Sequence, residues 1–504
     1  MSSQSESNPN PRRETPPEPI DWDRDLPPAT AEEEYAALKA SLRRNRGFGL
    51  LFAQCSPAQA NQLIERVGED LPQKRMGVLK LDSATQNVYE AVRQFLGEKD
   101  VEILFVTGLE LSLYAYEDQK RKEGWQSDRV YGYSWEGVPP VLRNLNQQRD
   151  RFRDNFDTGL VFLLPRFAVD YLIHRAPDFF DWRSGVFELP MDAEALQRES
   201  TRIVVEGDYG KYCTWTQAER YKKLIEIQAL LEEAGQTEAR KAQLWFERGL
   251  LLAAAREYEK AILSWDKALE FKPDYHEAWN NRGNALFNLG RYEEAINSFE
   301  RALEIKLDYD AAWYNRGIAL GNLGRYEEAI NSYDKALEIK PDKDAAWNHR
   351  GIALGNLGRY EEAITSFDKA LEIKPDYDAA WYNRGIALDD LGRYEEAITS
   401  YDKALQFKPE DDAAWNNRGI ALFNLGRYEE AITSYDKALE FKPDKDEAWY
   451  NKACCYGLQN QADLAIENLQ RAIELAPEKN RDMARTDSDF DSIRHDPRFQ
   501  ALLS

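Results

Sequence analysis

A tryptophan recurs every 34 residues in the second half of this 504-residue chain, and this period constrains the fold more than any other feature. Seven copies of one unit fill residues 242–479. A period of this length indicates stacked structural units, because one unit alone cannot bury its apolar surface. The tryptophans are Trp245, Trp279, Trp313, Trp347, Trp381, Trp415 and Trp449.

Each unit is predicted to be an antiparallel pair of helices. A glycine such as Gly317 follows the tryptophan by four residues, so both lie on one face of the first helix. A second glycine, such as Gly324, is placed to end that helix, and a proline such as Pro341 ends the second helix. The tryptophan row is therefore interpreted as structural rather than ligand-binding.

This pattern of Trp, Gly, Tyr, Ala, Phe or Tyr, Ala and Pro resembles the tetratricopeptide repeat family throughout residues 242–479. The resemblance implies an all-α solenoid, a right-handed superhelix of helical hairpins whose concave groove binds a protein or an extended peptide segment. The last unit diverges most, as terminal units do. Residues 480–504 resemble the capping helix and tail of such arrays.

The resemblance also implies that the first helices line the concave groove. One position there, two residues after each tryptophan, is almost always asparagine, whose amide can donate and accept hydrogen bonds along a peptide main chain. The alternative is that these amides are solvated or bonded to a neighbouring helix. The ladder is Asn281, Asn315, His349, Asn383, Asn417 and Asn451, and the position directly after each tryptophan adds Asn280, Tyr314, Asn348, Tyr382, Asn416 and Tyr450 as predicted groove residues.

The first half of the chain is predicted to be an α/β domain behind a disordered tail. Residues 1–28 are rich in Pro, Ser and Glu, and residues 206–241 are expected to form a linker helix. Within residues 29–205, continuous apolar runs alternate with helices, which predicts a three-layer domain with a parallel sheet covered on both faces. The predicted strands are residues 49–55, 76–81, 101–106 and 160–164, and helices are expected in residues 166–190.

This succession resembles the core of P-loop NTPases of the signalling type, in a degenerate form, and N-terminal modules that precede tetratricopeptide arrays in bacterial proteins. Residues 54–59 read QCSPAQ, without the glycines and lysine of a phosphate loop. Thr107 stands where the magnesium-binding aspartate is expected. We therefore expect a catalytically inactive second docking module, no enzyme and no cofactor. The alternative is a nucleotide-responsive signalling switch with the array as sensor.

Composition limits the partners. The net charge is −23, with 66 basic residues among 89 acidic ones, which argues against nucleic acid. No apolar run approaches the ~20 residues of a membrane span, and the N-terminus has no secretory pattern, so a cytoplasmic protein without membrane partners is expected. Four cysteines and four histidines are too scattered for a metal site.

An aromatic segment, residues 114–135, would suit a partner surface or an ordered loop. The oligomeric state is not indicated.

Overall fold

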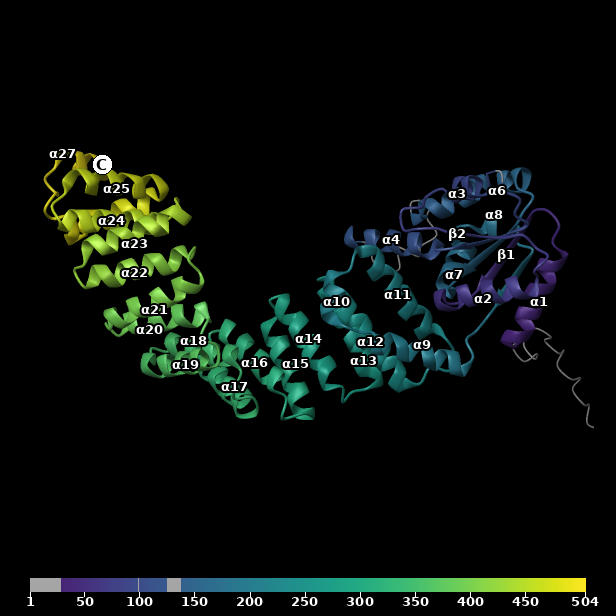
Figure 1. Ribbon diagram of the computed structural model, residues 1–504, viewed down its shortest axis with the longest axis horizontal. Coiled ribbons are helices and arrows are strands. Elements are labelled where there is room, and N and C mark those ends of the chain that lie inside the picture. The colour runs from purple at the N-terminus through teal and green to yellow at the C-terminus, as the bar shows by residue number, and fades with distance from the viewer. Residues whose placement is uncertain (1–28, 98, 125–136) are drawn as a thin grey trace, which may run out of the picture. The chain divides into compact units, whose positions relative to one another are not determined.

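The computed structural model describes residues 29–97, 99–124 and 137–504, which form two compact units divided between Glu247 and Arg248 (Figure 1). Each unit is described by itself. The predicted tail at residues 1–28 and residues 125–136, which include the second half of the aromatic segment, lie outside the described residues. Among the described residues, no helix combines the length and the apolar character needed to cross a membrane.

The first unit is built on a parallel sheet of five strands in the order β2-β3-β4-β1-β5. Leu51 of β1 pairs with Val161 of β4 and with Gly185 of β5. The strands are β1 (Gly49–Gln54), β2 (Met76–Lys80), β3 (Ile103–Thr107), β4 (Gly159–Leu164) and β5 (Gly185–Glu188).

Four of these strands were predicted, but β5 was not, because helices were expected throughout residues 166–190. The expectation of helices holds for α7 (Arg166–Arg175) and α8 (Pro177–Phe180) and is wrong for the residues of β5. This short strand lies at the edge of the sheet and buries only Phe187. It therefore lacks the continuous apolar run that identifies a central parallel strand.

Helices cover both faces of the sheet, as the three-layer prediction requires. Successive residues of β1 point to opposite faces: Leu51 packs in the core under α1 and α2, and Phe52 packs in the core under the other helices. The first face carries α1 (Ala31–Arg44) and α2 (Pro57–Asp70), and the second carries α3 (Val88–Leu96), α4 (Leu109–Lys122), α6 (Pro140–Asn155), α7 and α8.

Three further helices complete the first unit: α9 (Ala193–Val205), α10 (Tyr209–Thr214) and α11 (Gln217–Glu232). The helix α11 begins at the capping box of Thr216 and Glu219. It packs against α2, α4 and α9, and the Tyr221 hydroxyl donates to Asp118 Oδ2 at 2.6 Å. The segment expected to be a linker helix is therefore part of the packed first unit.

The second unit is a run of helical hairpins, which follow one another along it in Figure 1. The first hairpin is α12 (Glu238–Ala254), which crosses the boundary between the units, with α13 (Tyr258–Phe271). The following hairpins are α14 (His276–Asn288) with α15 (Tyr292–Ile305), α16 (Asp310–Asn322) with α17 (Tyr326–Ile339), α18 (Asp344–Asn356) with α19 (Tyr360–Ile373), α20 (Asp378–Asp390) with α21 (Tyr394–Phe407), α22 (Asp412–Asn424) with α23 (Tyr428–Phe441), and α24 (Asp446–Leu458) with α25 (Ala462–Leu475). The chain ends in α26 (Pro477–Thr486) and α27 (Pro497–Leu503), which form the terminal cap.

The two helices of a hairpin approach closely where a glycine faces an aromatic ring. A Cβ atom added to Gly351 would lie 2.6 Å from Cε1 of Phe367, well inside van der Waals contact. The tryptophans are half-buried, and the Trp347 indole Nε1 donates to the Pro341 carbonyl at 2.9 Å. Both features are structural. The other glycine–ring pairs are Gly249–Trp265, Gly283–Phe299, Gly317–Tyr333, Gly385–Tyr401 and Gly419–Tyr435.

An arginine in the first helix links each inner hairpin to the one before it. Arg350 Nε donates to Asp334 of the preceding hairpin at 2.6 Å, and its Nη1 donates to Ser366 of its own second helix at 2.8 Å. The same bracket recurs at Arg282, Arg316, Arg384 and Arg418. These guanidinium groups are about four-fifths buried, so the bracket is less screened by solvent than an exposed ion pair.

We expect Gly351→Ala to destabilise the array by about 1–3 kcal/mol, because the added methyl overpacks the contact with Phe367. Gly355→Ala is the matched control in the same helix, where an added Cβ meets no atom within 4 Å. That change should be neutral or stabilising by up to about 1 kcal/mol. Urea unfolding followed by helical circular dichroism measures both; equal effects would show that the ring contact does not set the helix spacing.

Candidate functional site: the first helices of the hairpins and the carboxyl edge of the sheet

The ladder amides link successive first helices. Asn315 Nδ2 donates to Asn280 Oδ1 at 3.1 Å and to Asn284 Oδ1 at 2.9 Å, both in the preceding hairpin. Asn383 Nδ2 donates in the same way to Asn348 Oδ1 at 3.2 Å, and Asn417 Nδ2 donates to the Tyr382 hydroxyl at 3.1 Å. The donor half of these three amides is therefore used within the array.

The acceptor half of the ladder remains available at Asn315 and Asn383, whereas Oδ1 of Asn281 and of Asn417 accepts from the preceding asparagine at 3.4 and 3.5 Å. Within the part of the chain that the structure describes, Oδ1 of Asn315 and Oδ1 of Asn383 accept no hydrogen bond. Both oxygens are accessible to solvent. His349 Nδ1 lies 2.8 Å from the Ala345 carbonyl oxygen, which only accepts, so Nδ1 carries the hydrogen and Nε2 is an acceptor. Asn281, Asn417 and Asn451 are also half-buried.

The position after each tryptophan offers much less surface to a partner. Asn280, Asn348, Asn416 and Tyr450 are buried, with exposed fractions of 3–6%. Tyr314 and Tyr382 are half-buried, and Tyr314 packs edge-on against the imidazole of His349 in the next hairpin. These six residues lie largely in contacts between neighbouring elements of the array.

An aliphatic row lies five residues after the tryptophans. Ile352 is 37% exposed, and the equivalent Ile318, Ile386 and Ile420 are half-buried. One hairpin departs from the repeat, because it carries Asp389 and Asp390 where its neighbour carries Gly355 and Asn356. Burial and then the nearby Asp390 raise the pKa of Asp389 to about 6, and Asp389 Oδ1 is buried without a partner. Sequence reasoning missed this acid, although its departure from the repeat was a detectable signal.

The carboxyl ends of the strands form the second candidate site. The loop after β1, where a phosphate loop was sought, enters α2 through a capping box. Ser56 Oγ accepts from the Gln59 backbone N–H at 3.2 Å, and Gln59 Oε1 accepts from the Ser56 N–H at 2.9 Å. Pro57 contributes no N–H. The helix N-terminus that would otherwise bind an anion is thus capped by the chain itself.

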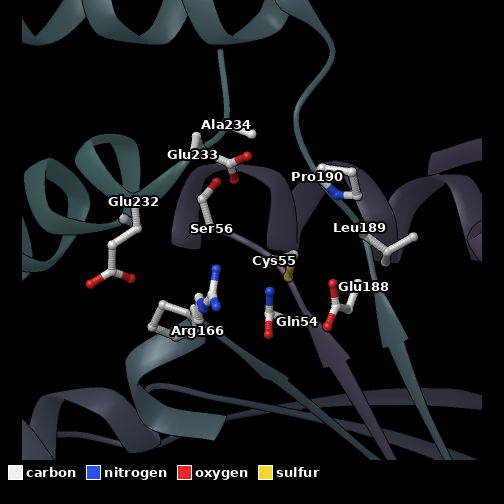
Figure 2. A pocket seen from close by; sticks show the side chains of 12 residues that line it. Gln54, Cys55, Ser56, Arg166, Glu188, Leu189, Pro190, Glu232, Glu233 and Ala234 are labelled. Carbon is white, nitrogen blue, oxygen red and sulfur yellow. The ribbon is translucent and has the colours of Figure 1, made fainter. Parts of the chain in front are cut away.

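A cavity of about 150 Å³ lies beside this loop, between the ends of β1 and β5, the start of α7 and the end of α11. Figure 2 shows the carboxylates of Glu188, Glu232 and Glu233 around the side chains of Arg166 and Gln54. Burial raises the pKa of Glu232, which the Gln228 hydrogen bond and the charge of Arg166 oppose. Arg166, the first residue of α7, therefore faces carboxylates rather than an open anion site.

Three potential metal ligands lie together in the terminal cap. Cys454, Asp487 and Asp489 place one ligand atom each within 4.8 Å of one another. Burial, followed by the two aspartates, raises the pKa of the Cys454 thiol, and the thiol donates to Asp487 Oδ2 at 3.8 Å. The hydrogen bond from the thiol accounts for the proximity of Cys454 to Asp487.

A second cavity at the carboxyl edge contains Glu110, at the start of α4. Its side chain is buried, and burial raises the pKa to about 7 although the N–H groups of Glu110 and Gly108 favour the charged form. Because the native pKa exceeds the ordinary value of 4.5, the native state binds this proton more tightly than the unfolded state does. The resulting stability is complete at low pH and is lost as the pH rises towards 7.

We therefore expect Glu110→Gln to flatten the pH dependence of stability. Over the whole titration the wild type should lose on the order of 3 kcal/mol relative to the variant. The free energy of unfolding of both chains, measured by urea titration from about pH 5.5 to about pH 8, tests this. Parallel curves for the two chains would mean that Glu110 titrates normally.

Comparison with known proteins matches the hairpins to models of one repeat family. Two models described as tetratricopeptide repeat match residues 276–309, 311–343, 348–412, 382–446 and 446–479, and a TPR repeat model matches residues 249–290. A search of curated proteins gives no match.

Three solved structures are among those to which the chain is similar. YrrB, described as a TPR protein with an unusual peptide-binding site, is 24% identical, with 37% of this chain and 97% of that chain covered and a TM-score of 0.34. The MamA protein is 24% identical, with coverages of 34% and 93% and a TM-score of 0.32. A tetratricopeptide repeat protein from Parabacteroides merdae ATCC 43184 is 19% identical, with coverages of 52% and 98% and a TM-score of 0.38.

Proposed function

The hairpins within residues 249–479 are tetratricopeptide repeats, and we propose that the chain is a protein-interaction scaffold that binds an extended polypeptide segment along their first helices. The observation that carries the proposal is a repeated surface of two kinds of group. Each of several hairpins offers a solvent-accessible acceptor, such as Asn315 Oδ1, and a partly exposed isoleucine, such as Ile352.

This surface suits a main chain better than a particular side chain. Acceptors such as Asn315 Oδ1 and Asn383 Oδ1 can meet N–H groups of an extended segment, while the isoleucines contact its apolar side chains. Each neutral hydrogen bond contributes only about 0.5–1.5 kcal/mol, so affinity is spread over several hairpins. Asp389 and Asp390 add two acidic side chains to one hairpin of this surface. They favour a basic residue of the partner at that point.

We propose that the first unit is a second docking module without catalytic activity. The capping box at Ser56 and Gln59, the absence of a lysine in residues 54–59, and Thr107 at the end of β3 all support this. The rival function, a nucleotide-responsive switch with the array as sensor, requires phosphate binding at this edge. Both proposed modules fit a cytoplasmic adaptor.

Exchange of exposed isoleucines tests the binding surface. Peptides of extended type are first selected from a displayed random library against the full chain, and their affinity is then measured by calorimetry. We expect Ile318→Ser, Ile352→Ser and Ile386→Ser together to weaken binding at least about tenfold, or 1.4 kcal/mol, through lost apolar contact.

The control is the triple change Ile305→Ser, Ile339→Ser and Ile373→Ser. These residues end the second helices, are 39–40% exposed, and carry the same side chain outside the proposed surface. The control should keep wild-type affinity. If both triple variants bind alike, the surface lies elsewhere and the first helices serve only to hold the array together.

Millimolar ATP with magnesium should leave the melting temperature of the full chain unchanged. A ligand at 100 times its Kd adds about 2.7 kcal/mol to stability, so even modest binding would be visible. Hydrogen exchange of residues 49–70 reports the same site directly. A clear rise in the melting temperature, together with slower hydrogen exchange in α2, would favour the nucleotide-responsive switch.

A further inference from the structure

A cavity of about 200 Å³ lies at the carboxyl ends of β1, β2, β3 and β4, under the middle of α11. It neighbours the cavity of Figure 2 and shares Cys55, Ser56 and Pro165 with it. In parallel α/β sheets this edge is where ligands bind. The helix α11 contributes Lys222 and Ile225 to the wall, so the cavity lies between the sheet edge and that helix.

Glu110 is the unusual group in this cavity. Its side chain lines the cavity, is 7% exposed, and has one carboxylate oxygen, Oε2, without a hydrogen-bond partner in the described residues. A buried polar atom without a partner is costly, and native structures contain few of them. A ligand that donates a hydrogen bond or carries a positive charge would satisfy this oxygen.

Two lysines, whose charge is opposite to that of the Glu110 carboxylate, line the same cavity. Lys80 ends β2, and Lys222 lies on α11; both are exposed and, among the described residues, neither ammonium has an ion-pair or hydrogen-bond partner. The cavity therefore combines a buried carboxylate with two solvent-facing ammonium groups. A ligand that satisfies both must carry a donor at one end and an anionic group at the other.

Size and wall chemistry narrow the ligand further. Sites for drug-sized ligands and cofactors occupy about 300–1,000 Å³, whereas a cavity of about 150 Å³ holds a molecule as small as benzene. The cavity therefore fits a ligand of amino-acid size. Leu81, Leu163 and Ile225 make part of the wall apolar.

We propose that this cavity binds a free α-amino acid with an aliphatic side chain. Its ammonium group donates to Glu110 Oε2, its carboxylate pairs with Lys222 and Lys80, and its side chain packs against Leu163 and Ile225. The ligand bridges α4, β2 and α11 and so holds α11 on the sheet edge. This small-molecule site is independent of the proposed peptide binding by the repeats.

Calorimetry of the full chain with leucine, isoleucine and valine tests the proposal. We expect at least one to bind with a Kd in the micromolar to millimolar range and to slow hydrogen exchange in α11. N-acetyl-leucine and leucinamide, which each lack one of the two charges, should bind at least about tenfold more weakly. ATP should not compete.

The variants separate recognition from folding. Glu110→Gln should raise the Kd for the amino acid at least about tenfold while leaving the weak binding of N-acetyl-leucine unchanged, and Lys222→Ala should raise the Kd severalfold. Lys99→Ala is the control, because this exposed lysine precedes β3 at the opposite edge of the sheet. The proposal is overturned if no amino acid binds, if Glu110→Gln binds as tightly as the wild type, or if a nucleotide binds this cavity instead.

Discussion

The array depends on one steric contact, in which a glycine of the first helix leaves room for an aromatic ring of the second helix. At Gly351 the ring of Phe367 occupies the space that a Cβ would need, and the same pairing recurs in the other hairpins through α22–α23. This close approach fixes the spacing within each hairpin. Because a hairpin still has an unburied face, every unit must then pack on its neighbours.

Polar links decide how neighbours are joined. The brackets at Arg350 and its equivalents tie the first helix of one hairpin to the second helix of the hairpin before it. Ladder amides such as Asn315 make a second link between first helices. Asn315 therefore has two roles: its N–H donors hold the array together, and its Oδ1 accepts no hydrogen bond among the described residues. A ladder variant consequently affects stability as well as binding.

The carboxyl edge of the sheet in the first unit differs between α2 and α4 in how its polar groups are satisfied. At α2 the chain caps its own helix N-terminus through the side chains of Ser56 and Gln59. At α4, two strands away, a buried carboxylate oxygen of Glu110 has no partner among the described residues, and two exposed lysines line the same cavity. The edge therefore satisfies its polar groups at α2 and leaves one open at α4.

The sequence alone determined the features that rest on local or repeated patterns. The 34-residue period gave the hairpins, and continuous apolar runs gave β1 to β4. Capping boxes such as that of Thr216 marked helix starts, because their hydrogen bonds join residues three apart.

Only the tertiary structure decided what depends on residues far apart in the chain. It added β5 at the sheet edge, where one buried phenylalanine leaves too little apolar pattern to read. It packed α11 onto the first unit through the bond from Tyr221 to Asp118, 103 residues away. It also paired the ladder donors with neighbouring hairpins and left Glu110 Oε2 without a partner among the described residues. The reason is that the partner of a polar group is set by what the fold brings beside it and not by its neighbours in sequence.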